Sequence, residues 1–191
     1  MKLILASTSR YRKELLARLR LAFDSVAPEV DETPLASELP TETARRLALA
    51  KAQAVRSRHP DALIIGSDQV AICEGQRLDK PGNHATAVGQ LKHASGRSVV
   101  FHTAVVLLNA RSGRIQAELI PTETRFRKLS DAEIERYLHA EPAYDCAGSA
   151  KSEALGISLL EKIESPDPTA LVGLPLIALC TMLRNEGISV P

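Results

Sequence analysis

The stretch Ala62-Leu63-Ile64-Ile65-Gly66-Ser67-Asp68-Gln69-Val70 does most to decide the fold. Its first four residues form a continuous apolar run that is too short for a helix and is bounded by a glycine. That pattern predicts a buried central strand. Asp68 is then expected at the carboxyl end of the strand, where open α/β sheets form their ligand crevice. An Asp after a strand also often hydrogen-bonds its own loop, so this position alone does not distinguish a site from a turn.

Helix and strand patterns alternate on both sides of this central run. Apolar stretches predict strands over 3–6 and 23–30, the second of them ending at Asp31 and Glu32. Two more strands, over 97–108 and 114–119, are joined by a hairpin turn at 109–113. Helical periodicity, caps and stop signals predict helices over 11–20, 41–58, 83–91, 130–139 and 175–187. Helices mixed with an antiparallel hairpin indicate the α/β class with a mixed sheet.

Composition limits the classes of protein that remain. A chain of 191 residues fits one domain or two small lobes sharing one core. Its 24 basic and 23 acidic residues nearly balance, which argues against a duplex-DNA binder. The basic residues of 10–20 lack interleaved aromatics, so no nucleic-acid partner is expected. The three cysteines are widely spaced and show no zinc-ligand pattern. The apolar segment 3–6 is too short for a signal peptide or a membrane span, which predicts a cytoplasmic protein without a membrane partner.

The junction of the first strand and helix has the chemistry of an anion site. Ser7, Thr8 and Ser9 precede Arg10 and Arg12 where unpaired backbone N–H groups and the positive helix end gather. Hydroxyl and guanidinium donors at such a point suit a phosphate. A serine that only caps the helix, with the arginines in solvent, explains the same residues equally well. Neither the P-loop nor the Rossmann glycine motif occurs.

Acidic and basic side chains elsewhere complement that junction. Asp31, Glu32 and Asp68 fall at two predicted strand ends, where three carboxylates could hold a hard divalent cation that bridges phosphate oxygens. For each of these acids taken alone, turn chemistry is the more common role. Lys51 falls within the apolar stripe of helix 41–58. It is expected either to extend its ammonium to the rim of the core or to enter a cleft that holds an anion, and the first is the default.

Two further segments carry candidate residues. Lys80 lies on the rigid stretch Lys80-Pro81-Gly82, where turn formation is the simpler explanation. Glu153 ends the small-residue stretch 148–153, which would let a ligand approach the backbone, although a plain polar loop explains it nearly as well.

Taken together, these segments resemble the Maf family. The similar stretches follow one another in the family's order over nearly the whole chain: 5–12, 30–32, 51–52, 66–70, 80–81, 147–153 and 167–175. Maf proteins are nucleotide pyrophosphatases related to the inosine-triphosphate pyrophosphatase fold. The resemblance implies one domain over 1–191, with a mixed, elongated, twisted sheet, flanking helices and a central cleft between two lobes. It also implies a homodimer and a Mg²⁺- or Mn²⁺-dependent hydrolysis of a nucleoside triphosphate to the monophosphate and pyrophosphate.

The resemblance also implies roles for individual residues. Ser7, Ser9 and Arg12 match the phosphate-binding motif of the family. Glu32 and Asp68 match its acidic, metal-holding site, with Asp68 as the proton acceptor. Lys51 and Lys80 match the family's lysines that face the triphosphate. Tyr11, Gln69 and Glu153 match the positions that distinguish its substrate branches.

The residues at those last three positions resemble the residues of the family branch that hydrolyses 7-methyl-GTP. Methylation at N7 makes guanine cationic, so the base should gain from stacking on Tyr11 and from the carboxylate of Glu153. The branch that cleaves dTTP and UTP is less similar, because it tends to have Arg where Tyr11 stands. A nucleotide-binding regulator without turnover, linked to septum formation, is the alternative from another class. The intact set of acids and lysines argues against it.

Overall fold

The computed structural model describes residues 1–191. By its internal contacts the chain divides into two compact units. Unit 1 comprises Met1–Gln69, Thr103–Ile120 and Asp167–Pro191. Unit 2 comprises Val70–His102 and Pro121–Pro166.

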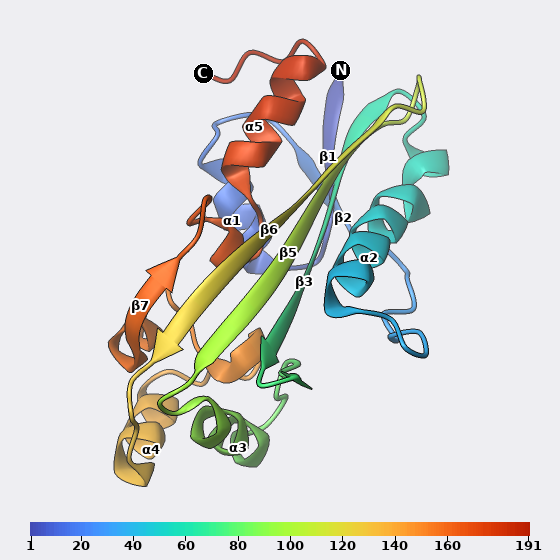
Figure 1. Ribbon diagram of the computed structural model, residues 1–191. Coiled ribbons are helices and arrows are strands. Elements are labelled where there is room, and N and C mark those ends of the chain that lie inside the picture. Colours follow the sequence, from blue (N-terminus) through green and yellow to red (C-terminus); the bar gives the residue numbers. More distant parts are fainter. The chain divides into compact units, whose positions relative to one another are not determined.

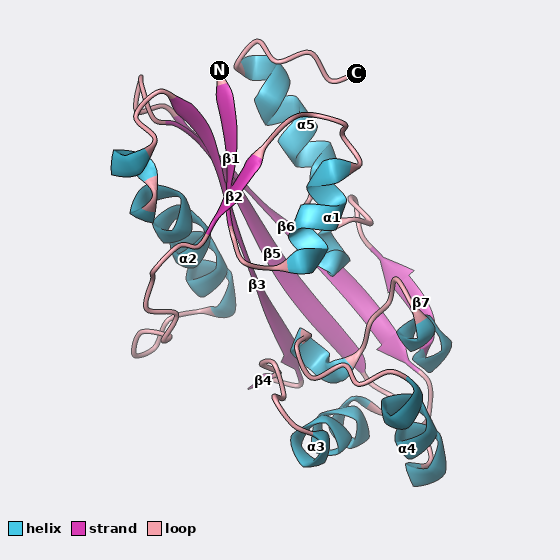
Figure 2. Ribbon diagram, turned by 180° about the vertical axis from the view of Figure 1, so that it is seen from behind, coloured by secondary structure: helices cyan, strands magenta, loops and turns pink.

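Seven strands form one mixed sheet (Figure 2). They are β1 (Lys2–Ala6), β2 (Asp24–Val26), β3 (Ala62–Cys73), β4 (Gln76–Arg77), β5 (Ser98–Asn109), β6 (Ile115–Phe126) and β7 (Leu160–Glu164). The order is β2-β1-β3-β5-β6-β7, with β4 paired to β3. β1 runs parallel to β2 and β3, whereas β4 and β7 run antiparallel to their partners. The predicted α/β class and mixed sheet are therefore confirmed.

Five α-helices accompany the sheet. They are α1 (Arg10–Ala17), α2 (Pro40–Ala54), α3 (His84–Ala94), α4 (Asp131–Ala140) and α5 (Leu176–Asn185). Each corresponds to a predicted helix, although the stretch expected over 41–58 ends as an α-helix at Ala54 and continues as a short 3₁₀ turn, Arg56–Arg58. No helix has both the length and the apolar character that crossing a membrane requires.

Unit 1 has helices on both faces of its strands (Figure 1). Alternate residues of the strands, such as Leu63 and Ile65 of β3, form one core with Leu16 of α1 and Leu179 of α5. Because successive strand residues point to opposite faces, the neighbouring positions of β3 face the other way, toward α2. The two faces of β3 therefore serve different helices.

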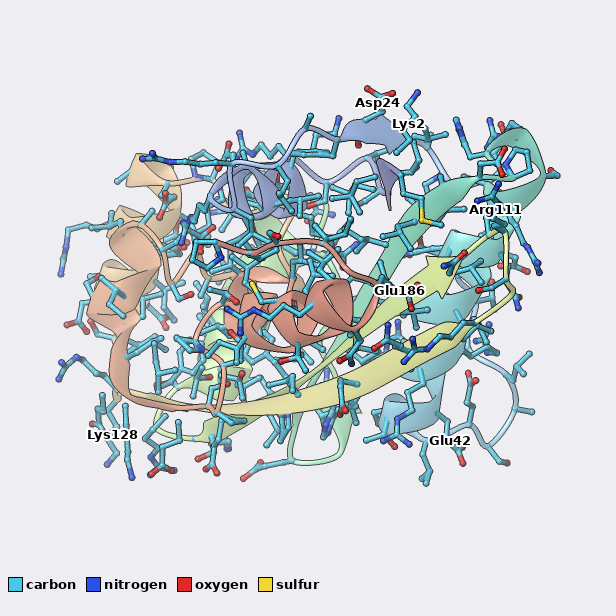
Figure 3. The ribbon with its side chains drawn as sticks, turned by 90° about the horizontal axis from the view of Figure 1, so that it is seen from above. Lys2, Asp24, Glu42, Arg111, Lys128 and Glu186 are labelled. Atoms are coloured by element: carbon cyan, nitrogen blue, oxygen red, sulfur yellow. The ribbon has the colours of Figure 1, made fainter.

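The strand predicted over 23–30 is much shorter than expected. β2 ends at Val26, since Pro28 has no N–H to donate to a ladder and restricts the conformation of the residue before it. An ion pair of 2.6 Å between Lys2 Nζ and the Asp24 carboxylate links β1 to β2, and the two side chains lie together in Figure 3. As a result Glu32 lies in a loop before α2 and does not end a strand.

β3 is correspondingly longer than expected. It continues to Cys73, so Asp68 lies inside the strand and not at its end. The residues after Asp68 include Val70 and Ile72, whose branched side chains favour extended backbone. The prediction of a strand was correct, but its carboxyl end was placed too early.

The helix starts predicted for unit 2 are confirmed by their capping hydrogen bonds. Asn83 caps α3 by accepting a hydrogen bond of 2.9 Å from the Thr86 backbone N–H. Ser130 and Glu133 form the predicted capping box at the start of α4. α3 packs against α4, and β7 pairs with β6.

Candidate active site

A buried lysine lies between two carboxylates in unit 1. Lys51 Nζ is 2.7 Å from Glu32 Oε1 and 2.7 Å from Asp68 Oδ1. The side chains of Lys51 and Asp68 are 6% and 7% exposed, whereas that of Glu32 is 59% exposed. The default expectation that Lys51 extends its ammonium to the rim is therefore wrong. Burial of an ammonium group is tolerable here because two anionic partners compensate for its lost hydration.

A glycine brings Lys51 and Asp68 together. A Cβ added to Gly66 would lie 2.1 Å from Ala48 O and 3.0 Å from Ala52 N. α2 therefore packs against β3 at a distance that only a glycine permits. Gly66 and Asp68 are two residues apart and share one face of β3. The close approach that needs Gly66 thus places the α2 lysine beside the β3 carboxylate.

The loop that carries Glu32 is fastened to α2 by a second charged pair. Arg46 Nη2 donates to Glu38 Oε2 at 2.8 Å and to Thr33 O at 3.2 Å. The bond from Arg46 is the main reason why the pKa of Glu38 falls to about 2. The nearby Asp31 accepts a bond of 2.9 Å from the Thr33 N–H, which is the turn role of a loop aspartate. Of the two loop acids, Glu32 is the one that reaches Lys51.

The junction of β1 and α1 shows the expected capping. Ser9 is the N-cap of α1, and its Oγ accepts from Arg12 N at 3.4 Å. Ser7 Oγ accepts from Ser9 N at 3.1 Å. Accepting these bonds engages oxygen lone pairs and not the hydroxyl protons. Ser9 therefore caps the helix and Ser7 braces the turn before it, and these bonds leave the hydroxyl protons of both serines for an acceptor such as a phosphate.

Arg12 belongs electrostatically to the same cluster. Its Nε donates to Gly173 O at 2.8 Å. Burial lowers the pKa of Arg12, while the charges of Asp68 and Glu32 act in the opposite direction. Two cations, Arg12 and Lys51, therefore lie within the field of the same two carboxylates.

Polar side chains of β3 hold the segment 170–173. Ser67 Oγ lies 2.9 Å from Gly173 O, the same carbonyl that binds Arg12. Gln69 Nε2 donates to Ala170 O at 3.0 Å and to Leu171 O at 3.1 Å. Sequence reasoning missed Ser67, although a hydroxyl directly after the apolar run 62–65 and Gly66 was a usable signal.

Asp167 is a second buried acid that the sequence did not single out as functional. It is 2% exposed, and its Oδ2 accepts a bond of 2.7 Å from the Ile177 backbone N–H in the first turn of α5. Its Oδ1 accepts from both the backbone N–H and the hydroxyl of Thr169. These bonds fix the segment that leads into 170–173, so Asp167 has a structural role.

Tyr11, an expected specificity residue, contacts its neighbour Arg10. The guanidinium carbon of Arg10 lies 4.7 Å from the centroid of the Tyr11 ring. Arg10 Nη2 also donates to the Tyr11 hydroxyl at 2.7 Å. Tyr11 thus already takes part in the type of cation–π contact that a cationic base would make.

Two of the predicted site residues, Lys80 and Glu153, belong to unit 2. Both are exposed. The loop after Lys80 is held by a bond of 3.0 Å from Gly82 N to Tyr144 O. Glu153 follows Lys151, whose backbone N–H donates to the Tyr137 hydroxyl at 3.0 Å. The roles of Lys80 and Glu153 in the site stay predictions.

The residues around Lys51 fit a hard divalent cation. Glu32 and Asp68 supply carboxylate oxygens, the ligand type that Mg²⁺ and Mn²⁺ prefer. Both carboxylates already approach one positive charge, because each has an oxygen 2.7 Å from Lys51 Nζ. The same two side chains could therefore ligate a metal ion.

Comparisons with known proteins show the family of the chain. The family described as "Maf-like protein" matches residues 2–186. A protein of Aromatoleum aromaticum named 7-methyl-GTP pyrophosphatase is 59% identical over 190 residues, covering 100% of this chain and 98% of its own. Proteins of the same name from Thiobacillus denitrificans and Ralstonia nicotianae are each 60% identical, covering 98% and 96% of this chain and 94% of their own lengths. The chain belongs to the Maf family.

Proposed function

We propose that this protein is a nucleoside triphosphate pyrophosphatase that hydrolyses 7-methyl-GTP to 7-methyl-GMP and pyrophosphate. The full-length similarity to relatives named 7-methyl-GTP pyrophosphatase supports the substrate. The observation that carries the chemistry is the contact of the buried Lys51 with the buried Asp68 and the exposed Glu32. Cations and carboxylates that converge in this way suit the binding of linked phosphates and the activation of water.

Asp68 is the group that we assign as proton acceptor. Water attacks the α-phosphorus in line with the departing pyrophosphate, a reaction that depends mainly on positioning and on charge neutralisation. Lys51 Nζ engages Oδ1 of Asp68, so Oδ2 is the atom assigned to the proton of the attacking water. A base in this role needs to lie within hydrogen-bond reach of the water, about 3 Å.

The phosphates are assigned mainly to cations and hydroxyls of unit 1. Arg12, held by Gly173 O, and the hydroxyls of Ser7 and Ser9 bind phosphate oxygens. Lys51 exchanges a carboxylate partner for a phosphate oxygen when the nucleotide binds. A Mg²⁺ or Mn²⁺ ion held by Glu32 and Asp68 would supply neutralisation of the charge that develops on those oxygens. Lys80 is assigned to the same triphosphate.

Base selection is assigned to Tyr11, Gln69 and Glu153. The cationic 7-methylguanine ring stacks on Tyr11, in place of the Arg10 guanidinium or on the opposite ring face. Gln69 acts through the segment 170–171, which its amide holds. The Glu153 carboxylate favours the positive charge of the base. We further propose that the protein works as a homodimer.

The test is pyrophosphate release by the purified protein across a substrate panel. We expect 7-methyl-GTP to be hydrolysed faster than GTP, dTTP, UTP and CTP, and only when Mg²⁺ or Mn²⁺ is present. Faster release from dTTP and UTP would instead place the protein in the pyrimidine branch. No release from any nucleotide, with retained nucleotide binding, would indicate a regulator without turnover.

A second comparison isolates the charge of the base. The variant Glu153→Gln keeps the shape of the side chain and removes its charge. We expect it to reduce kcat/KM more for 7-methyl-GTP than for GTP, because only the methylated base is cationic. Equal losses on both substrates would remove the charge argument.

A further inference from the structure

Two histidines and a glutamate of unit 2, none of them assigned to hydrolysis, lie together. His84 Nε2 is 2.8 Å from Glu135 Oε2, and His139 Nε2 is 3.6 Å from the same oxygen. Ligand atoms from all three side chains lie within 4.8 Å of one another. Imidazole nitrogens and a carboxylate oxygen are ligands that zinc accepts in proteins.

The helices explain why the three side chains meet. Glu135 and His139 are four residues apart on α4 and therefore share one face of that helix. His84 is the first residue of α3, directly after the N-cap Asn83. Because α3 packs against α4, His84 faces the pair on α4, and its ring lies 5.3 Å from that of His139. The cluster thus rests on two helices and not on mobile loop side chains.

The other nitrogen of His84 has a partner of the type that supports a metal ligand. His84 Nδ1 lies 2.9 Å from the Tyr144 hydroxyl. Histidines that bind metals through one nitrogen usually donate a hydrogen bond through the other, which fixes the tautomer and the orientation of the ring. In the metal-bound state, with Nδ1–H donating to Tyr144, the lone pair of Nε2 binds the ion on the side that faces Glu135 in the metal-free chain.

We propose that His84, Glu135 and His139 form a zinc-binding site. Bonds of about 2.0–2.1 Å in a tetrahedral site place neighbouring ligand atoms roughly 3.3 Å apart. The two separations from Glu135 Oε2, 2.8 and 3.6 Å, lie on either side of that value. Small side-chain rotations are therefore enough to accommodate the ion.

The ligand types and the exposure of the cluster define what it binds. Two nitrogen ligands disfavour Mg²⁺ and Ca²⁺, which take oxygen ligands, so this site differs from the carboxylate pair of unit 1. The side chains of His84, Glu135 and His139 are 37%, 46% and 77% exposed, which gives the ion an open path and leaves a fourth position for water. Binding displaces the proton shared by His84 and Glu135 into solvent. The ion would link α3 to α4 and stabilise the folded chain.

The test uses calorimetric titration of the full chain, dialysed free of metal, with ZnCl₂ and with MgCl₂. We expect about one Zn²⁺ per chain, a higher Tm with zinc, and no comparable Mg²⁺ binding at this cluster. The variants His139→Gln and His84→Gln should each weaken zinc binding at least about tenfold, because each removes one of three ligands. Circular dichroism checks that both variants fold.

Two control variants separate this site from other zinc ligands. His59→Gln removes a histidine of unit 1 whose backbone bonds to Arg56 and Ala62, and it should bind zinc as the wild type does. Cys146→Ser removes a partly buried thiol of unit 2 and should also leave binding intact. Absence of zinc binding in the wild type would overturn the proposal. Undiminished binding in folded His139→Gln and His84→Gln, or its loss only in Cys146→Ser, would do the same.

Discussion

Replacement of Gly66 by alanine tests how closely the packing of α2 controls the site. The added Cβ would lie 2.1 Å from Ala48 O, a backbone atom that no side-chain rotation can move away. It would also lie 3.1 Å from Ala52 Cβ. α2 can relieve the clash only by moving away from β3, and it carries Lys51 with it.

The size of the effect follows from that geometry. To restore an ordinary contact, α2 must move by about 1 Å, which lengthens the bond of 2.7 Å between Lys51 Nζ and Asp68 Oδ1 beyond hydrogen-bond range. Overpacking of this kind costs about 1–3 kcal/mol. For a chain of this size the loss corresponds to a decrease in Tm of roughly 2–12 °C. A displacement of about 1 Å at reacting groups lowers turnover on the order of 100-fold.

The assay measures Tm and the rate of pyrophosphate release from 7-methyl-GTP for Gly66→Ala. Gly89→Ala is the matched control, because Gly89 lies within α3 and a Cβ there would meet nothing within 4 Å. Alanine at an open helical position should leave Tm unchanged or raise it slightly. Wild-type Tm and wild-type turnover in Gly66→Ala would refute the account of the packing.

Two other variants probe the supports of the site. Because the pKa of Glu38 is lowered from 4.5 to about 2, its ionised form stabilises the fold above about pH 4.5, and the effect disappears as pH falls toward 2. The Tm of Glu38→Gln should therefore lie below that of the wild type at pH 7, and the difference should narrow on acidification. A difference in Tm that does not depend on pH would contradict this. Glu118→Gln on β6 is the control. Asp167→Ala should lower the free energy of unfolding in urea by about 1–3 kcal/mol, because the backbone N–H groups of Thr169 and Ile177 lose the acceptor that the buried carboxylate provides. Unchanged stability would show that other groups satisfy those N–H donors.

Signals that act over a few residues predicted much of the fold. Asn83 and the pair of Ser130 and Glu133 marked the starts of α3 and α4, because a cap depends only on the adjacent turn. The buried character of β3 was also visible, since a covered strand reads as an apolar run. Its end was not, because pairing with a neighbouring strand, and not composition, decides how far a strand continues.

Contacts between distant residues could not be predicted in the same way. Periodicity placed Lys51 on the apolar stripe of α2, but nothing local showed that its ammonium would meet Glu32 and Asp68. The need for a glycine at position 66 likewise arises from the approach of α2. The bond from Ser67 to Gly173 O joins residues 106 positions apart. The resemblance to the Maf family suggested site residues that local patterns did not, and the structure shows what Lys51, Arg12 and Gln69 contact. Their roles in the site stay predictions.

The most direct test of the central claim is the steady-state hydrolysis of 7-methyl-GTP by Asp68→Asn. This variant keeps the shape of the side chain beside Lys51 and removes the group assigned to accept the proton. The account predicts that kcat falls by roughly 10²–10⁴-fold. A folded Asp68→Asn protein that keeps wild-type kcat would contradict it.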